Sequence, residues 1–149
     1  MKNEANFNSI ISSSINTKGY AYKIPDTFSS SGMRSIAPFD GFGWCDGKFI
    51  CWEAKYLTEP KAFNFKRLEN HQIKSLISAY ENIKNCESIF IIGVNFGRAD
   101  KRCFVFKNKD LYYIKDRKEK GESLLKKEFE NLPYFKIKKN QIDIEELLK

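Results

Sequence analysis

Two carboxylates and a lysine lie close together around one short turn of this 149-residue chain. Asp40 precedes the turn pair Asp46-Gly47, and Glu53-Ala54-Lys55 follows it. Carboxylate oxygens are preferred ligands of Mg²⁺, and a neighbouring ammonium group can position water or steady a phosphate. These residue types are the minimum set for metal-assisted cleavage of a phosphodiester.

The Asp46-Gly47 pair between two aromatic-rich runs predicts a β-hairpin. With this pair as the two turn residues, Asp40 faces Glu53 across the hairpin. Opposed residues have Cβ atoms about 4.5–5.5 Å apart, where two carboxylates repel each other unless a cation lies between them. Lys55 follows two residues after Glu53 and therefore shares its face. The competing interpretation is an edge salt bridge in which Lys55 simply neutralises both carboxylates.

The elements around this hairpin predict one mixed α/β domain over residues 1–149, in the order α-β-β-β-α-β-β-α. Apolar residues at helical spacing predict helices, and short β-rich runs predict strands. One segment, 111–114, is compatible with either. The predicted elements are a helix over 4–16, a strand over 19–24, a mobile Ser-rich loop over 26–37, the hairpin, a helix over 67–84, strands over 88–96 and 102–106, a charged loop over 116–122, and a helix over 123–131 that begins at Ser123.

Composition supports a folded domain with a polyanionic partner. The chain is 42% hydrophobic and 15% aromatic, which is enough to build a core. Its 26 basic and 19 acidic residues give a net charge of +7, which favours nucleic acid, although a solvated basic surface would give the same figure. No apolar run approaches the ~20 residues of a membrane helix, and no secretory signal is evident, so we expect a cytoplasmic protein without a membrane partner.

The cysteines and the histidine exclude several other chemistries. The four cysteines show no CxxC spacing, and His71 is the single histidine. Neither a structural zinc site nor a Cys-His catalytic pair is credible on that basis. We expect buried, reduced thiols.

The spacing of Asp40 and Glu53-Ala54-Lys55 resembles the PD-(D/E)XK nuclease superfamily, with Phe39-Asp40 in place of Pro-Asp. Further motifs extend the likeness over most of the chain to RecU-type Holliday junction resolvases of Gram-positive bacteria and their phages. These motifs are Glu4 in an early helix, Lys23-x-Pro25 after the first strand, His71-Gln72-Ile73 at a helix start, and the charged run 116–120.

The resemblance implies a compact restriction-endonuclease-like domain, with a central mixed sheet flanked by helices, that acts as a homodimer in a bacterial cell or for a phage. It implies paired nicking of four-way DNA junctions with Mg²⁺, for which Mn²⁺ can substitute. Asp40, Glu53 and the backbone carbonyl of Ala54 would hold the metal, Lys55 would assist catalysis, and Glu4 would complete the site. Glu4 also lies on the inward stripe of its helix, which suits a buried partner or a metal; a first-turn acid that favours the helix dipole is the alternative.

Several polar residues are candidates for substrate contact. Gln72 lies one turn before Leu76, so its amide could reach the catalytic water or a phosphate; an ordinary polar residue at a helix start is the alternative. The stretch 115–127 carries six basic and three acidic residues, which suits either phosphate binding or a solvated face. The predicted DNA contacts are Lys23, Arg34, His71, Arg117, Lys118 and Lys120.

The chain departs from the family pattern between Pro25 and Phe39. RecU proteins carry a long stalk there, whereas this segment is short and Ser-rich. Two other functions therefore stay open: a PD-(D/E)XK endonuclease acting on ordinary duplex DNA, and a basic DNA-binding protein without catalysis, in which Asp40, Glu53 and Lys55 form a structural ion pair.

Overall fold

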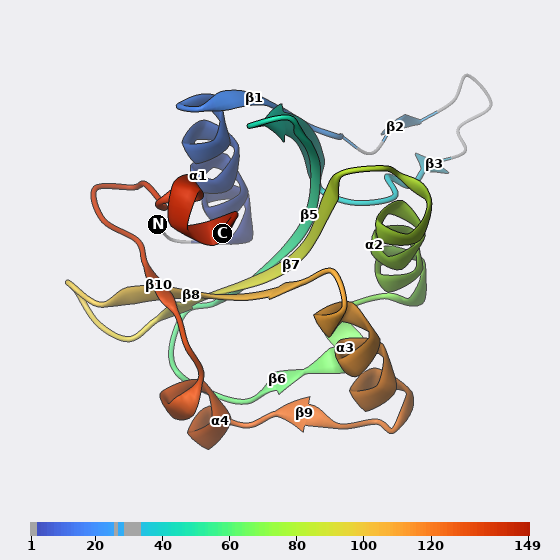
Figure 1. The fold of residues 1–149 in the computed structure, drawn as a ribbon. Coiled ribbons are helices and arrows are strands. Elements are labelled where there is room, and N and C mark those ends of the chain that lie inside the picture. The colour runs from blue at the N-terminus through green and yellow to red at the C-terminus, as the bar shows by residue number, and fades with distance from the viewer. Residues whose placement is uncertain (1–2, 26, 29–33) are drawn as a thin grey trace.

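A six-stranded mixed sheet forms the centre of the computed structural model, which describes residues 3–25, 27–28 and 34–149 (Figure 1). Strands β4 and β5 form the predicted hairpin, and β5 pairs in parallel with β7. In spatial order the strands are β1 (Gly19–Lys23), β4 (Gly41–Cys45), β5 (Lys48–Leu57), β7 (Cys86–Asn95), β8 (Lys101–Lys107) and β10 (Phe135–Lys136).

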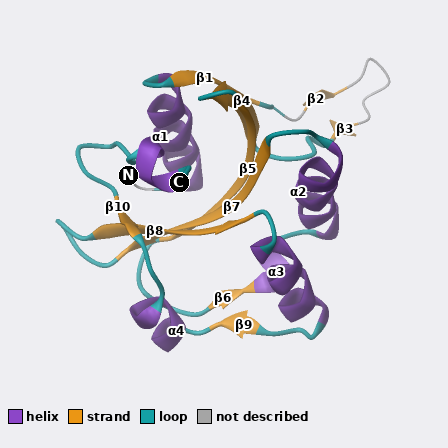
Figure 2. Cartoon of the chain, in the orientation of Figure 1, coloured by secondary structure: helices purple, strands orange, loops and turns teal. Residues whose placement is uncertain are grey.

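Helices cover both faces of this sheet (Figure 2). One face packs on α1 (Glu4–Asn16) and the short α5 (Ile144–Leu147) through Phe7, Ile50 and Trp52. The other packs on α2 (Asn70–Asn82) and α3 (Asp110–Glu119). The α/β class and the flanked mixed sheet are thus confirmed. In the described part of the chain, no helix combines the length and the apolar character that a bilayer span would need.

The turn of the hairpin has the predicted form. Asp46 and Gly47 both adopt positive φ, at 53° and 74°, as the central residues of a type I′ turn do. The register places Cys45 opposite Lys48 and continues to Gly41 opposite Trp52. Side chains of β5 consequently alternate between the two cores, which places Glu53 and Lys55 on one face, as predicted.

The first part of the charged segment, 116–119, is helical, and only 120–122 form the predicted loop. Asp110–Glu119 form α3, because Leu111 and Ile114 are fully buried at helical spacing and Arg117 continues the same stripe. The ambiguous residues 111–114 are therefore helical. The charge of Arg117 suggests a side chain in solvent. In the structure this side chain is 11% exposed and lies over the ring of Phe65.

Ser123 does not begin a helix either. Ser123–Leu124 form β9, which pairs with β6 (Phe63–Asn64), and α4 (Lys126–Asn131) begins later. The extended conformation lets Leu124 reach the core, where it is 1% exposed.

Three smaller elements complete the fold. A 3₁₀ turn, η1 (Phe65–Arg67), occupies the start of the helix predicted over 67–84. Strands β2 (Thr27–Phe28) and β3 (Arg34–Ser35) pair within the segment predicted as a mobile loop. The rest of that prediction, at residues 26 and 29–33, lies outside the described residues.

Candidate active site

Asp40 is held immediately before β4 by bonds to the middle of β5. Its amide N–H donates to the carbonyl of Trp52 at 2.9 Å, and its Oδ2 accepts from the amide of Ala54 at 2.9 Å. The paired register follows the prediction as far as Gly41 and Trp52 and ends there, so Asp40 and Glu53 are not a ladder pair, although both line the same pocket. The carboxylate instead lies beside the backbone of β5 where β4 no longer covers it.

Two further contacts hold this carboxylate in place. Asn8 of α1 donates from Nδ2 to Asp40 Oδ2 at 3.2 Å and accepts from the indole of Trp52 at 2.9 Å. Gly41 leaves room for that indole: a Cβ at this position would lie 2.3 Å from a Trp52 ring carbon. The glycine after Asp40 is thus required by packing.

Glu53 is a buried carboxylate with an unusual balance of partners. The residue is 1% exposed, and its Oε1 accepts no hydrogen bond from the described residues. Burial and, next, the nearby charge of Asp40 raise the pKa of Glu53 to about 8, although Lys55 opposes them. Lys55 therefore offsets only part of the effect of burial and of Asp40 on this carboxyl group.

Lys55 joins Glu53 to Glu4. Its Nζ lies 3.4 Å from Glu53 Oε1 and 3.7 Å from Glu4 Oε1, and its side chain is 11% exposed. Arg67 approaches the other oxygen of Glu4 at 3.5 Å and donates to the carbonyl of Tyr56. Glu4 therefore contacts the two cations of the site and reaches Glu53 only through Lys55.

A pocket of about 180 Å³ opens beside the two carboxylates. Asp40 and Glu53 line it together with Glu69, His71 and Gln72 from the start of α2. Gln72 accepts from the Glu69 amide at 2.8 Å, which explains why a glutamine stands at this helix start. His71 lies 3.2 Å from the Glu69 carboxylate. The structure thus brings Gln72 and His71 to the same pocket as the predicted acidic pair.

The donors at this pocket suit a hard divalent cation. Among the described residues no three His, Cys, Asp or Glu side chains converge as a ligand group. Two carboxylates do meet here, and backbone geometry adds a third oxygen. The N–H and C=O of one strand residue point the same way, so the carbonyl of Ala54 is directed to the edge where its amide binds Asp40. Two carboxylates and a carbonyl, with one carboxylate oxygen lacking a hydrogen bond, fit Mg²⁺ or Mn²⁺.

The basic residues predicted to contact DNA fall into different surroundings. Lys23 ends β1 and reaches Ser9 at 3.1 Å, and Arg34 lies in β3, where only the backbone is described. Lys118 donates to the carbonyl of Phe65, and the exposed Lys120 pairs with Asp116. Lys23, Lys118 and Lys120 are not among the residues that line the pocket of Asp40 and Glu53.

Arg117 is placed as a structural residue. Its guanidinium pairs with Glu128 at 2.6 Å and Glu122 at 2.7 Å and donates to the carbonyl of Ser123. The side chain is 11% exposed and lies over the ring of Phe65. These contacts join α3 to α4 and β9, so we no longer expect Arg117 to contact DNA.

Two residues of the site escaped the sequence analysis. Asn8 lies four residues after Glu4, so both are on one face of α1, and this spacing is the signal that could have found it. The sequence pattern predicts Arg67 only as the first residue of the helix over 67–84, whereas the structure places it in η1. Nothing in the local pattern indicates that η1 returns Arg67 to Glu4.

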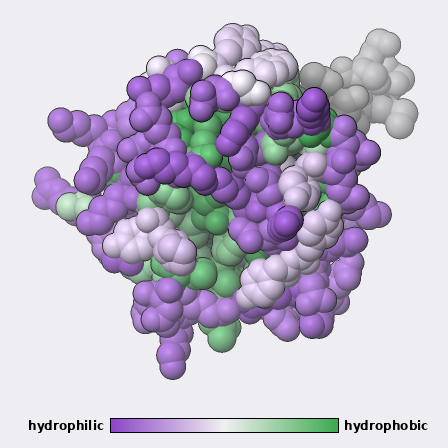
Figure 3. Space-filling view, in the orientation of Figure 1, coloured by the Kyte–Doolittle hydropathy of each residue, from purple (hydrophilic) through white to green (hydrophobic). Residues whose placement is uncertain are grey.

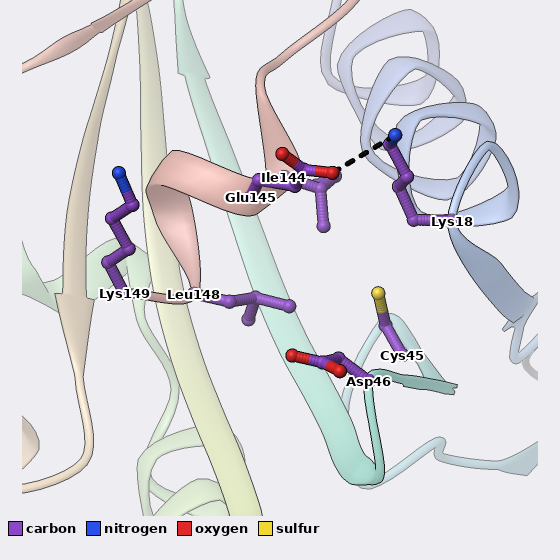
Figure 4. A pocket seen from close by; sticks show the side chains of 7 residues that line it. All are labelled: Lys18, Cys45, Asp46, Ile144, Glu145, Leu148 and Lys149. Carbon is purple, nitrogen blue, oxygen red and sulfur yellow. Dashed lines mark ion pairs between the residues drawn. The ribbon is translucent and has the colours of Figure 1, made fainter.

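A larger hollow of about 480 Å³ lies beside α5 (Figure 4). Lys18 and Glu145 line it and pair with each other at 3.0 Å, and its other walls include Cys45 and Leu148. Its two acidic residues, Asp46 and Glu145, are both exposed, whereas Glu53 of the smaller pocket is buried. The pocket of Asp40 and Glu53 is therefore the candidate active site.

Comparison with known protein families gives a match over most of the chain. The family model described as RecU, Recombination protein U, matches residues 11–148. Asp40, Glu53, Lys55 and Gln72 lie within the matched range, and Glu4 and Asn8 precede it. No curated protein matches the chain.

Proposed function

This chain belongs to the RecU family of Holliday junction resolvases, and on that premise we propose that it is a Mg²⁺-dependent endonuclease that nicks four-way DNA junctions. We assign the reaction to the pocket of Asp40, Glu53 and Lys55. The observation that carries this assignment is Glu53, a buried carboxylate beside a second carboxylate, with one oxygen that accepts no hydrogen bond. The same oxygen lies 3.4 Å from Lys55 Nζ, but burial and the charge of Asp40 outweigh that ion pair in setting the pKa of Glu53, so a divalent cation beside it would stabilise the ionised form.

Asp40, Glu53 and the carbonyl of Ala54 are the residues that would hold the cation. When bound, Mg²⁺ activates water and neutralises charge on the phosphodiester. Asn8 and the Ala54 amide fix Asp40 Oδ2, so this carboxylate needs little reorganisation. Burial of Glu53 keeps competing water away from its oxygens.

Lys55 supplies a positive charge beside Glu53. Its Nζ is held between Glu53 and Glu4, within reach of both, so the ammonium is preorganised rather than mobile. We assign to Lys55 the role of orienting the attacking water or of stabilising the charge that develops on the phosphate. Glu4 acts as a positioning residue, because it contacts Lys55 and Arg67.

Paired nicks require two such sites in a fixed relation. One pocket cuts one strand, so a two-fold symmetric homodimer is the simplest arrangement that cuts two strands of a junction symmetrically. We propose this assembly for the chain.

The test is cleavage of a labelled four-way junction and a matched linear duplex, with Mg²⁺ or with EDTA. We expect symmetric, Mg²⁺-dependent nicks in the junction, lost in Lys55→Ala. Lys48→Ala is the matched control, because Lys48 lies on the same strand and also pairs with a glutamate, Glu87 at 3.1 Å. It should still cut.

The other outcomes discriminate between the remaining functions. Equal cutting of both DNAs would indicate a duplex endonuclease. Binding without cutting would indicate a DNA-binding protein in which Lys55 is part of a structural ion pair. Cutting that survives Lys55→Ala would refute the assignment of the site.

A further inference from the structure

Five aromatic side chains lie together on one sheet face at the β1 edge. The register pairs Tyr20 with Trp44 and Tyr22 with Phe42, while Trp44 also faces Phe49. Side chains of paired residues share a face, so all five rings point the same way. We call Tyr20, Tyr22, Phe42, Trp44 and Phe49 the aromatic platform.

Four of the five rings, those of Tyr22, Phe42, Trp44 and Phe49, contact one another. Centroids of Phe42 and Trp44 are 5.7 Å apart, those of Trp44 and Phe49 are 5.5 Å apart, and those of Tyr22 and Phe42 are 5.7 Å apart. Such spacing is normally found in a core. Here the rings form an apolar surface that spans three adjacent strands, β1, β4 and β5.

This surface is open. Tyr20 is 59% exposed, Trp44 51% and Tyr22 48%. Figure 3 shows pale side chains of intermediate hydropathy gathered over β1 at the top of the molecule. Helix α1 covers the opposite face of these strands, where Ala21 packs. A contiguous exposed aromatic patch of this kind indicates a binding surface.

The outer edge of β1 is closed to another strand at its centre. The amide of Ala21 donates to Oδ1 of Asn16 at 2.9 Å, so it is not available for pairing with a strand from a second chain. The ring face of the platform, and not the strand edge, is what remains to bind a partner.

The platform adjoins the candidate active site on the same face. The side chains of Phe49, Glu53 and Lys55 lie on the same side of β5. On the neighbouring strand, Phe42 follows Asp40 by two residues. At about 3.3 Å per residue, Phe42 lies roughly 7 Å along the strand from the acidic residue and Trp44 roughly 13 Å. That is the span of a few nucleotides.

We propose that the aromatic platform binds unpaired bases of a DNA strand by stacking, beside the phosphodiester that is cut. The inference rests on the proposed function, because it assumes a DNA strand in the Asp40 pocket. Aromatic rings accept any base on their π-face, and Tyr and Trp keep a polar atom for the water around the strand. A branched substrate would thereby be distinguished from a continuous duplex, whose bases are already stacked.

A second copy of the chain is the less suitable occupant. A protein surface seated on Phe42 and Trp44 would begin within about 7 Å of Asp40 along the strand and would obstruct the path of DNA to the pocket. The platform also contains no carboxylate that would repel a phosphate backbone, and the chain carries a net charge of +7.

The two tryptophans allow a test on the unaltered protein. Trp44 is half exposed and Trp52 is 1% exposed, so acrylamide should quench chiefly Trp44. In EDTA, where no cutting occurs, we expect a (dT)₁₂ oligonucleotide to quench this emission and to protect it from acrylamide. A linear duplex at equal phosphate concentration should do neither. Unchanged emission and unchanged acrylamide quenching with (dT)₁₂ would overturn the proposal.

A matched pair of variants completes the experiment. Trp44→Leu keeps an apolar side chain but removes the ring, and should weaken binding of (dT)₁₂ about tenfold. Tyr112→Leu is the control, because Tyr112 is similarly exposed at 44% but lies on α3, and it should bind as the wild type does. Wild-type affinity in Trp44→Leu would overturn the proposal, and so would a loss accompanied by dissociation of a dimer in sedimentation, which would assign the platform to a second copy.

Failure of the proposed function would look different. Lys55→Ala in EDTA should retain the quenching, since the platform is intact. A protein that does not cut junctions but still shows the quenching by (dT)₁₂ would refute the proposed nuclease function. The proposal that the aromatic platform binds bases would stand.

Discussion

Replacing Glu53 with glutamine should change how the stability of the protein depends on pH. Burial and the charge of Asp40 raise the pKa of Glu53 from 4.5 to about 8 in the folded protein. In the unfolded chain the carboxylate titrates near its ordinary value. Between these two values the folded state binds a proton that the unfolded state has released, so stability falls as pH rises.

The size of the effect follows from that interval. Each pH unit between the two pKa values lowers the free energy of unfolding by about 1.4 kcal/mol. From pH 5 to pH 8.5 the contribution of Glu53 is therefore on the order of 4 kcal/mol. It levels off above pH 8, once the folded carboxylate has ionised.

Urea denaturation in EDTA at several pH values measures this directly. The wild type should lose stability from pH 5 to 8.5, whereas Glu53→Gln should lose about 4 kcal/mol less over the same range. The variant also loses the ion pair with Lys55, so the comparison uses the slope with pH and not the value at one pH. Glu130→Gln, on the exposed face of α4, should follow the wild-type slope. Parallel curves for the wild type and Glu53→Gln would refute the argument that Glu53 is a strained, buried carboxylate.

Three further substitutions test the surroundings of the site. Asn8→Ala removes a donor to Asp40 Oδ2 and should weaken Mg²⁺ binding about tenfold in calorimetry; unchanged affinity would show that Asn8 does not position Asp40. Gly41→Ala forces a methyl group against Trp52 and should cost about 1–3 kcal/mol in urea denaturation, and a neutral result would contradict the packing argument. Arg117→Gln should cost about 3 kcal/mol of stability and leave DNA affinity of the folded protein unchanged in anisotropy; lower affinity with full stability would restore Arg117 as a DNA contact.

The hairpin shows how far local spacing reaches. An Asp-Gly pair has few alternatives to a type I′ turn, and the two-residue period of a strand then assigns every side chain to a face. For that reason Glu53 and Lys55 could be placed on one face, and α2 could be predicted from its apolar stripe, before any tertiary contact was known.

The two-residue period of a strand could not place Asp40, which lies just before the first paired residue of β4. A two-residue period assumes that pairing continues, but the ladder stops at Gly41 and the Asp40 carboxylate binds the Ala54 amide. The prediction that Arg117 lies in a charged loop was wrong for a related reason. Its charge suggests solvent, whereas Glu122 and Glu128, brought close by β9 and α4, form ion pairs that hold it in the interior.

The sequence by itself determined the hairpin, the apolar stripes of the helices and the family motifs. Each of these depends on neighbours within a few positions of the chain. Tertiary structure alone decided that Glu53 is buried with an oxygen lacking a hydrogen bond, that Asn8 supports Asp40, and that Tyr20, Tyr22 and Trp44 remain exposed on the same sheet face. Burial and partnership depend on segments distant in sequence, and the pKa of a carboxylate depends on both.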